Sequence, residues 1–133
     1  MKYFLDTNIC VYYLKGIYPE LAHTLLAHHP DEIRIPSIVK AELLHGAYRS
    51  KRTEENLKKI HEFLLPFRII PFGDAETDRY ATIRAELEEA GQIIGPNDLI
   101  MAAIVAENDG VLVTNNEREF RRLQKLRVEN WTG

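Results

Sequence analysis

The stretch GPNDLIMAAIVAENDGVLVTNN, residues 95–116, decides the fold class. Pro96 suits the first turn of a helix, and the residues that follow it are almost wholly apolar. A helix that is apolar on all sides needs cover on all sides, so we expect it to lie centrally in the fold. The apolar run Val111–Val113 follows at once and predicts a buried strand. A helix leading directly into a buried strand is typical of parallel α/β sheets.

The rest of the chain repeats this alternation of helix and strand. Strands are expected at residues 2–5, 32–37, 67–72 and 110–116, with a short one at 127–130. Helices are expected at residues 8–15, 19–28, 37–48, 54–65, 74–90 and 99–107. We expect Ser37 and Thr53 to be N-caps, Asn56 to replace the usual glutamate of a capping box, and Gly91 to end a helix. The pattern predicts a three-layer α/β/α fold with a central, mainly parallel sheet of four to five strands.

Length and composition fit a single domain spanning residues 1–133, with no linker and no internal repeat. The one cysteine, Cys10, excludes an internal disulfide and favours a reducing cytoplasm. The longest apolar run, Leu99–Ala106, is too short to span a bilayer, so no membrane association is expected. The net charge of −3 gives no general argument for a nucleic-acid partner, so any such argument must come from local basic patches.

Acidic and polar side chains stand where the predicted elements end. Asp6 follows the first strand, and Thr114 and Asn116 follow the fourth. Functional crevices of open α/β sheets lie outside the carboxyl ends of the strands, so these side chains are expected at one edge. Glu42 falls on a partly apolar helix face, and Asp98 stands at the head of the apolar helix.

Each of these residues also has a simpler explanation. Asp6 could cap the first helix, Glu42 could be a solvated helix glutamate, and Asp98 could complement a helix dipole. Asn116 and Glu119 could be ordinary turn and helix-start residues. Together, however, carboxylates a few ångströms apart repel one another by several kcal/mol unless they share protons or bind a cation. Binding of Mg²⁺ or Mn²⁺ would relieve that repulsion. If Asp6 binds the cation, Thr7 or Asn8 could cap the first helix in its place.

Motifs for other chemistries are missing from the sequence. It contains no GxxxxGK phosphate loop, no GxSxG elbow and no Cys/His spacing suited to zinc. A carboxylate site is therefore the principal catalytic candidate.

Four segments together resemble one known family. They are FLDTN (4–8), SIVKAELLHG (37–46), GPNDLIMAAIVAENDGVLVTNNEREF (95–120) and LRVENW (126–131). In this order they resemble the PIN-domain ribonucleases, specifically the VapC toxins of bacterial toxin–antitoxin pairs. The resemblance implies a Mg²⁺- or Mn²⁺-dependent endoribonuclease toxin that inhibits translation and growth.

The resemblance also maps the acidic site of that family onto Asp6, Glu42 and Asp98. Asp6 and Asp98 would be direct metal ligands, and Glu42 would position metal or water. Many PIN domains carry a further aspartate past the last long strand, where this chain has Asn116. Either Asn116 or Glu119 would complete the site, and the sequence leaves that choice open.

RNA would be held by two local basic stretches. The first contains Arg49, Lys51 and Arg52, and the second, in the C-terminal tail, contains Arg118, Arg121, Arg122, Lys125 and Arg127. Both could instead be solvated helix faces.

The resemblance implies three partners: an RNA such as tRNA, a VapB-type antitoxin that covers the active site, and a second copy of the chain in a homodimer.

Two other functions compete with this interpretation. A haloacid dehalogenase-like phosphatase also begins with a strand that ends on aspartate, but its second aspartate is Asn8 here, and no later lysine fits. A catalytically inactive PIN fold that only binds RNA or protein is the other alternative, and three intact acids argue against it.

Overall fold

Five short strands form one fully parallel sheet in the order β3-β2-β1-β4-β5. The computed structural model describes all residues from 1 to 133. The strands are β1 (Tyr3–Leu5), β2 (Ile33–Pro36), β3 (Arg68–Ile70), β4 (Val111–Val113) and β5 (Arg127–Glu129). All five predicted strands are present, and β1 is central, with β2 and β3 on one side and β4 and β5 on the other.

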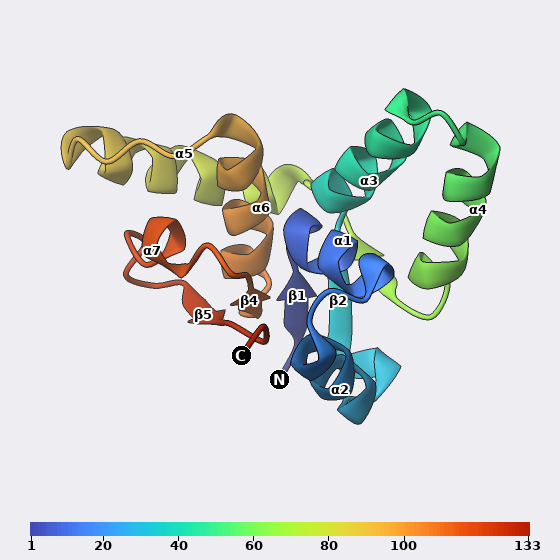
Figure 1. Cartoon of the computed structure of the whole chain (residues 1–133). Helices are drawn as coiled ribbons and strands as arrows, with labels where there is room; N and C mark the ends of the chain where they lie inside the picture. Colours follow the sequence, from blue (N-terminus) through green and yellow to red (C-terminus); the bar gives the residue numbers. More distant parts are fainter.

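Helices flank this sheet. They are α1 (Thr7–Lys15), α2 (Pro19–Ala27), α3 (Ser37–Arg49), α4 (Thr53–Leu64), α5 (Asp74–Glu89), α6 (Pro96–Glu107) and α7 (Glu117–Phe120), with a 3₁₀ turn η1 (Pro30–Glu32). In Figure 1, α3 and α4 form a hairpin on one side of the sheet, and α5 packs on α6 on the other. The predicted three-layer α/β/α architecture is confirmed. None of the helices combines the length and apolar character that a membrane crossing requires.

Helix α6 occupies the central position that its apolar sequence predicted. It packs against α3, α5, β2 and β4, and its residues from Met101 to Val105 are all buried. The central strand β1 is largely buried and its neighbour β4 is fully buried, with Leu5 and Leu112 completely inaccessible. The core therefore fixes α6 directly beside the sheet edge that carries the site.

Two helix starts differ from the sequence prediction. Ser37 is the first residue of α3, with Pro36 at the N-cap, and Thr53 is the first residue of α4, with Arg52 at the N-cap. Neither helix has a side-chain cap. Pro36 has no polar side chain, and at α4 Thr53 donates to the Ser50 carbonyl while Asn56 donates to the Ser50 hydroxyl. Both capping predictions were therefore wrong by one residue, which is the usual uncertainty of helix ends.

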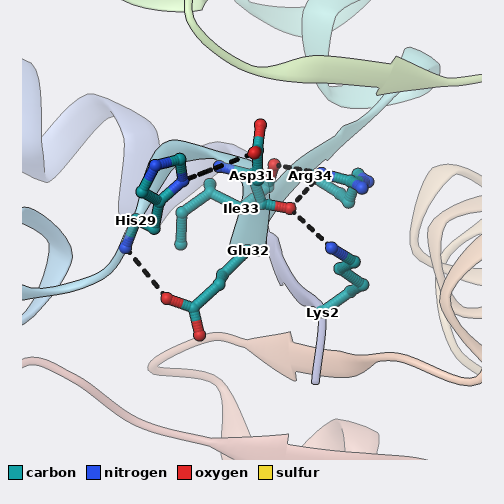
Figure 2. Close-up of polar contacts among 6 residues, drawn as sticks. All are labelled: Lys2, His29, Asp31, Glu32, Ile33 and Arg34. Atoms are coloured by element: carbon teal, nitrogen blue, oxygen red, sulfur yellow. Dashed lines mark hydrogen bonds and ion pairs between the residues drawn. The ribbon is translucent and has the colours of Figure 1, made fainter.

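The amino ends of β1 and β2 are tied together by a polar network (Figure 2). Lys2 and Arg34 both donate to the backbone carbonyl of Asp31, Lys2 over 2.8 Å. The Glu32 carboxylate accepts from the backbone N–H of His29 over 2.9 Å, which closes the η1 turn. These contacts lie at the amino ends of β1 and β2, opposite the carboxyl ends that carry the acidic residues. They stabilise the pairing register of the two strands, on which the positions of the acidic residues depend.

Candidate active site

Asp6 lies where β1 passes into α1. Its backbone N–H extends the sheet by donating to the Val113 carbonyl over 3.1 Å. Its side chain is the N-cap of α1, with Oδ1 accepting from the Ile9 N–H over 2.8 Å. The expectation that Thr7 or Asn8 would take the capping role was therefore wrong. Asp6 is a cap and still faces the site, because one carboxylate oxygen suffices for capping.

Asp6 is buried, with 5% of the residue exposed, and this burial dominates the electrostatics of its carboxylate. Burial raises the pKa of Asp6 from 3.8 to about 6, against the lowering effect of hydrogen bonds from Thr114 and the Ile9 N–H. The nearby charge of Glu42 raises this pKa further. A buried acid with a raised pKa and a second acid beside it is typical of a functional site.

Asp98 lies in the first turn of α6 and is half-buried. The pKa of Asp98 is raised to about 7, and burial is the largest cause. A hydrogen bond with Glu119 and the negative charges of Glu119, Glu42 and Asp6 also raise this pKa. All three predicted acids, together with Glu119, thus lie close enough to affect one another. The structure brings together the carboxylates that the sequence placed at this edge.

Glu42 turns into the site from the middle of α3. Its carboxylate accepts a hydrogen bond of 2.6 Å from the Thr7 hydroxyl and one of 3.3 Å from the Asn97 side-chain amide. Neither donor was identified as a site residue from the sequence. Their only sequence signal is that each is the immediate neighbour of a candidate acid, in the pairs Asp6-Thr7 and Asn97-Asp98.

The structure distinguishes the two candidates for the fourth position. Glu119 raises the pKa of Asp98 by hydrogen bonding and by its charge, whereas the exposed Asn116 donates its side-chain amide to Glu119 over 2.8 Å. The backbone N–H of Asn116 also donates to the Thr114 hydroxyl over 2.9 Å. Glu119 is thus the carboxylate that touches the acidic cluster, and Asn116 orients it.

The chemistry of this cluster suits a hard, hydrated cation. No three histidine, cysteine or carboxylate side chains lie close enough to hold one metal ion between them. Mg²⁺ is commonly held by one or two carboxylates and keeps several water ligands. The carboxylates of Asp6 and Asp98 fit that requirement, and the lack of histidine or cysteine in the cluster does not suit zinc.

Comparison with known proteins agrees with this geometry. The sequence profile of the PIN domain matches residues 3–126. The chain is also 44% identical to "Ribonuclease VapC2" of Rickettsia felis and 37% identical to "Ribonuclease VapC2" of Haemophilus influenzae, over 98% of each chain. The chain belongs to the VapC ribonucleases of the PIN-domain family.

Other VapC relatives resemble the chain over its full length. It is 33% identical to the "tRNA(fMet)-specific endonuclease VapC" of Shigella flexneri, over 99% of both chains. Among solved structures, DNA-bound VapBC of Salmonella typhimurium matches with a TM-score of 0.93 and 31% identity, over 98% of both chains. VapBC2 of Rickettsia felis, bound to a promoter DNA fragment, matches with a TM-score of 0.90 and 42% identity, covering 98% of this chain and 99% of that one.

The predicted RNA-binding residues of this VapC-family chain are exposed but differ in their contacts. Arg49 follows Glu42 by seven residues, which places it on the same face of α3, about 10 Å along the helix. Lys51 and Arg52 lie in the turn after α3, where Arg52 pairs with Glu55 over 3.6 Å. Their RNA contacts remain a prediction.

The second basic stretch lies around α7. Arg121 pairs with Glu117 over 2.9 Å, whereas Arg118 is exposed and makes no salt bridge. Arg118 is therefore the freer of the two to meet a phosphate, because Arg121 would first have to leave its carboxylate.

An apolar groove extends from the acidic cluster. One cavity of about 470 Å³ begins at Thr7 and Glu42 and passes between α1, α3 and α4. It shares Leu14 and Lys59 with a second cavity of about 630 Å³ that Leu26 also lines. We call this continuous surface the α1–α4 groove, and it leads directly to the site.

Proposed function

We propose that this VapC-family chain is a Mg²⁺- or Mn²⁺-dependent endoribonuclease. The observation that carries the proposal is the meeting of Asp6, Glu42, Asp98 and Glu119 at one end of the parallel sheet, with two pKa values raised by burial and mutual charge. The relatives named above are ribonucleases or endonucleases by name. An RNA substrate also implies action in the cytoplasm.

Asp6 and Asp98 would hold the cation in this mechanism. A cation held there would supply Lewis-acid polarisation of a phosphodiester oxygen and a water molecule of lowered pKa for in-line attack on phosphorus. Glu42 would orient the attacking water through its carboxylate. Glu119, held by Asn116, would add its negative charge to the cation site beside Asp98. We expect products with 5′-phosphate and 3′-hydroxyl ends.

The substrate proposed is a structured RNA such as tRNA, whose loss would inhibit translation and growth. The name of the Shigella flexneri relative specifies a tRNA. Arg49 supports this substrate class because it lies on the Glu42 face of α3 and makes no salt bridge with an acidic side chain. The Arg49 guanidinium, about 10 Å along α3 from Glu42, would meet a phosphate of an RNA strand bound at the acidic cluster.

Incubation of total RNA with the purified protein tests this function. We expect cleavage with Mg²⁺ or Mn²⁺ and none with EDTA, because Asp6 and Asp98 can activate water only through a bound cation. Mapping of the cut ends should give 5′-phosphates. A covalent phosphoenzyme on Asp6 would instead support a phosphatase, and RNA binding without cleavage would support an inactive binding module.

We further propose that a VapB-type antitoxin occupies the α1–α4 groove and thereby covers the site. Leu14 and Leu26 line the groove yet are 39% and 72% exposed, so apolar surface there lacks a partner within the chain. The groove ends at Glu42, so an occupant would block the acidic cluster. The similar solved structures named above are VapBC complexes. A homodimer within the larger complex is part of the same proposal.

Introducing charge into this groove should weaken antitoxin binding. Leu26→Glu is expected to raise the Kd of the cognate antitoxin by about 10-fold or more, since burial of an unpaired carboxylate costs at least about 1.4 kcal/mol. Cleavage of RNA by the free toxin should not change. Leu65→Glu is the matched control, because Leu65 is 85% exposed and lies outside the groove. Equal Kd values for both variants, measured by calorimetry, would exclude the groove as the antitoxin site.

A further inference from the structure

The carboxylate of Glu42 is held at both of its oxygens by residues from other helices. The Thr7 hydroxyl, at the start of α1, donates to Oε1 over 2.6 Å. The Asn97 amide, in the first turn of α6, donates to Oε2 over 3.3 Å. Three helices that are distant in sequence thus converge on one carboxylate.

The contact from Thr7 differs from those of Thr53, Thr77 and Thr82. Each of these three threonines donates its hydroxyl to the backbone carbonyl three residues earlier in the chain. Thr7, the first residue of α1, instead donates to the carboxylate of Glu42 on another helix. The 2.6 Å distance is in the range of a charge-assisted O–H···O⁻ bond.

An unrestrained glutamate on a helix samples many rotamers, and ordering it costs up to about 2 kcal/mol of side-chain entropy. A carboxylate that must orient a water molecule gains from being ordered before the reaction begins. The two donors meet this need at Glu42. They are also the chain neighbours of Asp6 and Asp98, so the same backbone segments place the proposed cation ligands and the restraints on Glu42.

We propose that Thr7 and Asn97 are positioning residues that fix the Glu42 carboxylate relative to Asp6 and Asp98. This inference rests on the proposed ribonuclease function. It assigns Thr7 and Asn97 no contact with substrate, because each acts through Glu42. It also makes the hydroxyl of Thr7, rather than its methyl group, the functional part of that side chain.

Paired substitutions test the assignment in the full-length protein. Thr7→Val removes the hydroxyl with little change of shape, and Asn97→Ala removes the amide. Each is expected to lower kcat by about 10- to 100-fold, the usual effect of losing such an orienting partner, with KM unchanged within about twofold. Thr7→Ser should restore most of kcat, because it keeps the hydroxyl. Thr82→Val, which loses only a local backbone contact, is the matched control and should cleave at the wild-type rate.

A double-mutant cycle shows whether Thr7 acts through Glu42. In a Glu42→Ala background, Thr7→Val should slow single-turnover cleavage no further, because the group it orients is already gone. The inference would be overturned if Thr7→Val slowed cleavage equally in the wild-type and the Glu42→Ala backgrounds. It would also be overturned if the single variants Thr7→Val and Asn97→Ala both kept the wild-type kcat. The dissociation constant of Mn²⁺ without RNA, measured by calorimetry, should change less in Thr7→Val than in Asp6→Asn. If Asp6→Asn cleaved RNA normally, the proposed function would fail. If Asp6→Asn were inactive and Thr7→Val cleaved RNA at the wild-type rate, only the present inference would fail.

Discussion

Exchange of Asp6 for asparagine is expected to reduce RNA cleavage by about 100-fold or more. Cation-based activation is worth several kcal/mol to the transition state, and each 1.4 kcal/mol corresponds to about tenfold in rate. The exchange keeps an oxygen that can accept from the Ile9 N–H, and asparagine caps helices about as well as aspartate. The loss can therefore be assigned to chemistry rather than unfolding. Single-turnover cleavage of RNA with Mn²⁺ gives the measurement.

Asp98→Asn should give a loss of similar size, because Asp98 is the other proposed direct ligand. Asp78→Asn is the matched control, since it removes one carboxylate from an exposed position of α5. Its cleavage rate should equal that of the wild type. Normal cleavage by Asp6→Asn or Asp98→Asn would show that these carboxylates do not hold the catalytic cation.

The main features of the fold follow from local sequence patterns. Alternating apolar strands and amphipathic helices predicted the parallel sheet, and the apolar segment after Pro96 predicted the central helix α6. Because parallel strands end at one edge, Asp6 after β1 could be assigned to the same crevice as the residues after β4. Asp98 could be added because the head of a helix packed against the sheet lies at that edge.

Other features depend on contacts that spacing does not encode. Thr7 and Glu42 are 35 residues apart, and Asn97 and Glu42 are 55 apart, so only the packing of α1, α3 and α6 brings them together. The choice between Asn116 and Glu119 depends on α7, whose four residues are too few to show a helical period.

Asp6 also had to be weighed as either a cap or a site residue, although the structure shows that these two roles are compatible. A carboxylate has two oxygens, and the sequence cannot show that one oxygen caps α1 while the carboxylate still faces Glu42. Treating the two roles as exclusive led to the wrong assignment of the cap to Thr7 or Asn8.

Without divalent cations, the folded chain is expected to lose stability as the pH rises from about 4 to about 7. The pKa of Asp6 is raised from 3.8 to about 6, and that of Asp98 from 3.8 to about 7. Below pH 3.8 both carboxyl groups are protonated in the folded and in the unfolded state, so their ionisation does not change the free energy of unfolding. Between the unfolded and folded pKa values the folded state binds more protons, and stability therefore falls with rising pH. Above about pH 7 the full penalty remains.

The size of this effect is largest at Asp6, because it is almost fully buried. A rise of about two pKa units corresponds to at most about 3 kcal/mol, and the half-exposed Asp98 contributes less because solvent screens its charge.

Unfolding by urea in EDTA at pH 5 and pH 8 measures the loss of stability. Asp6→Asn should lose less stability between these two values than the wild type, since it has no charge to bury. Mn²⁺ at pH 8 should stabilise the wild type and have little effect on Asp6→Asn, because a cation that binds only the folded state offsets the repulsion. An identical loss in both proteins would mean that the buried charge of Asp6 does not limit the stability of the metal-free site.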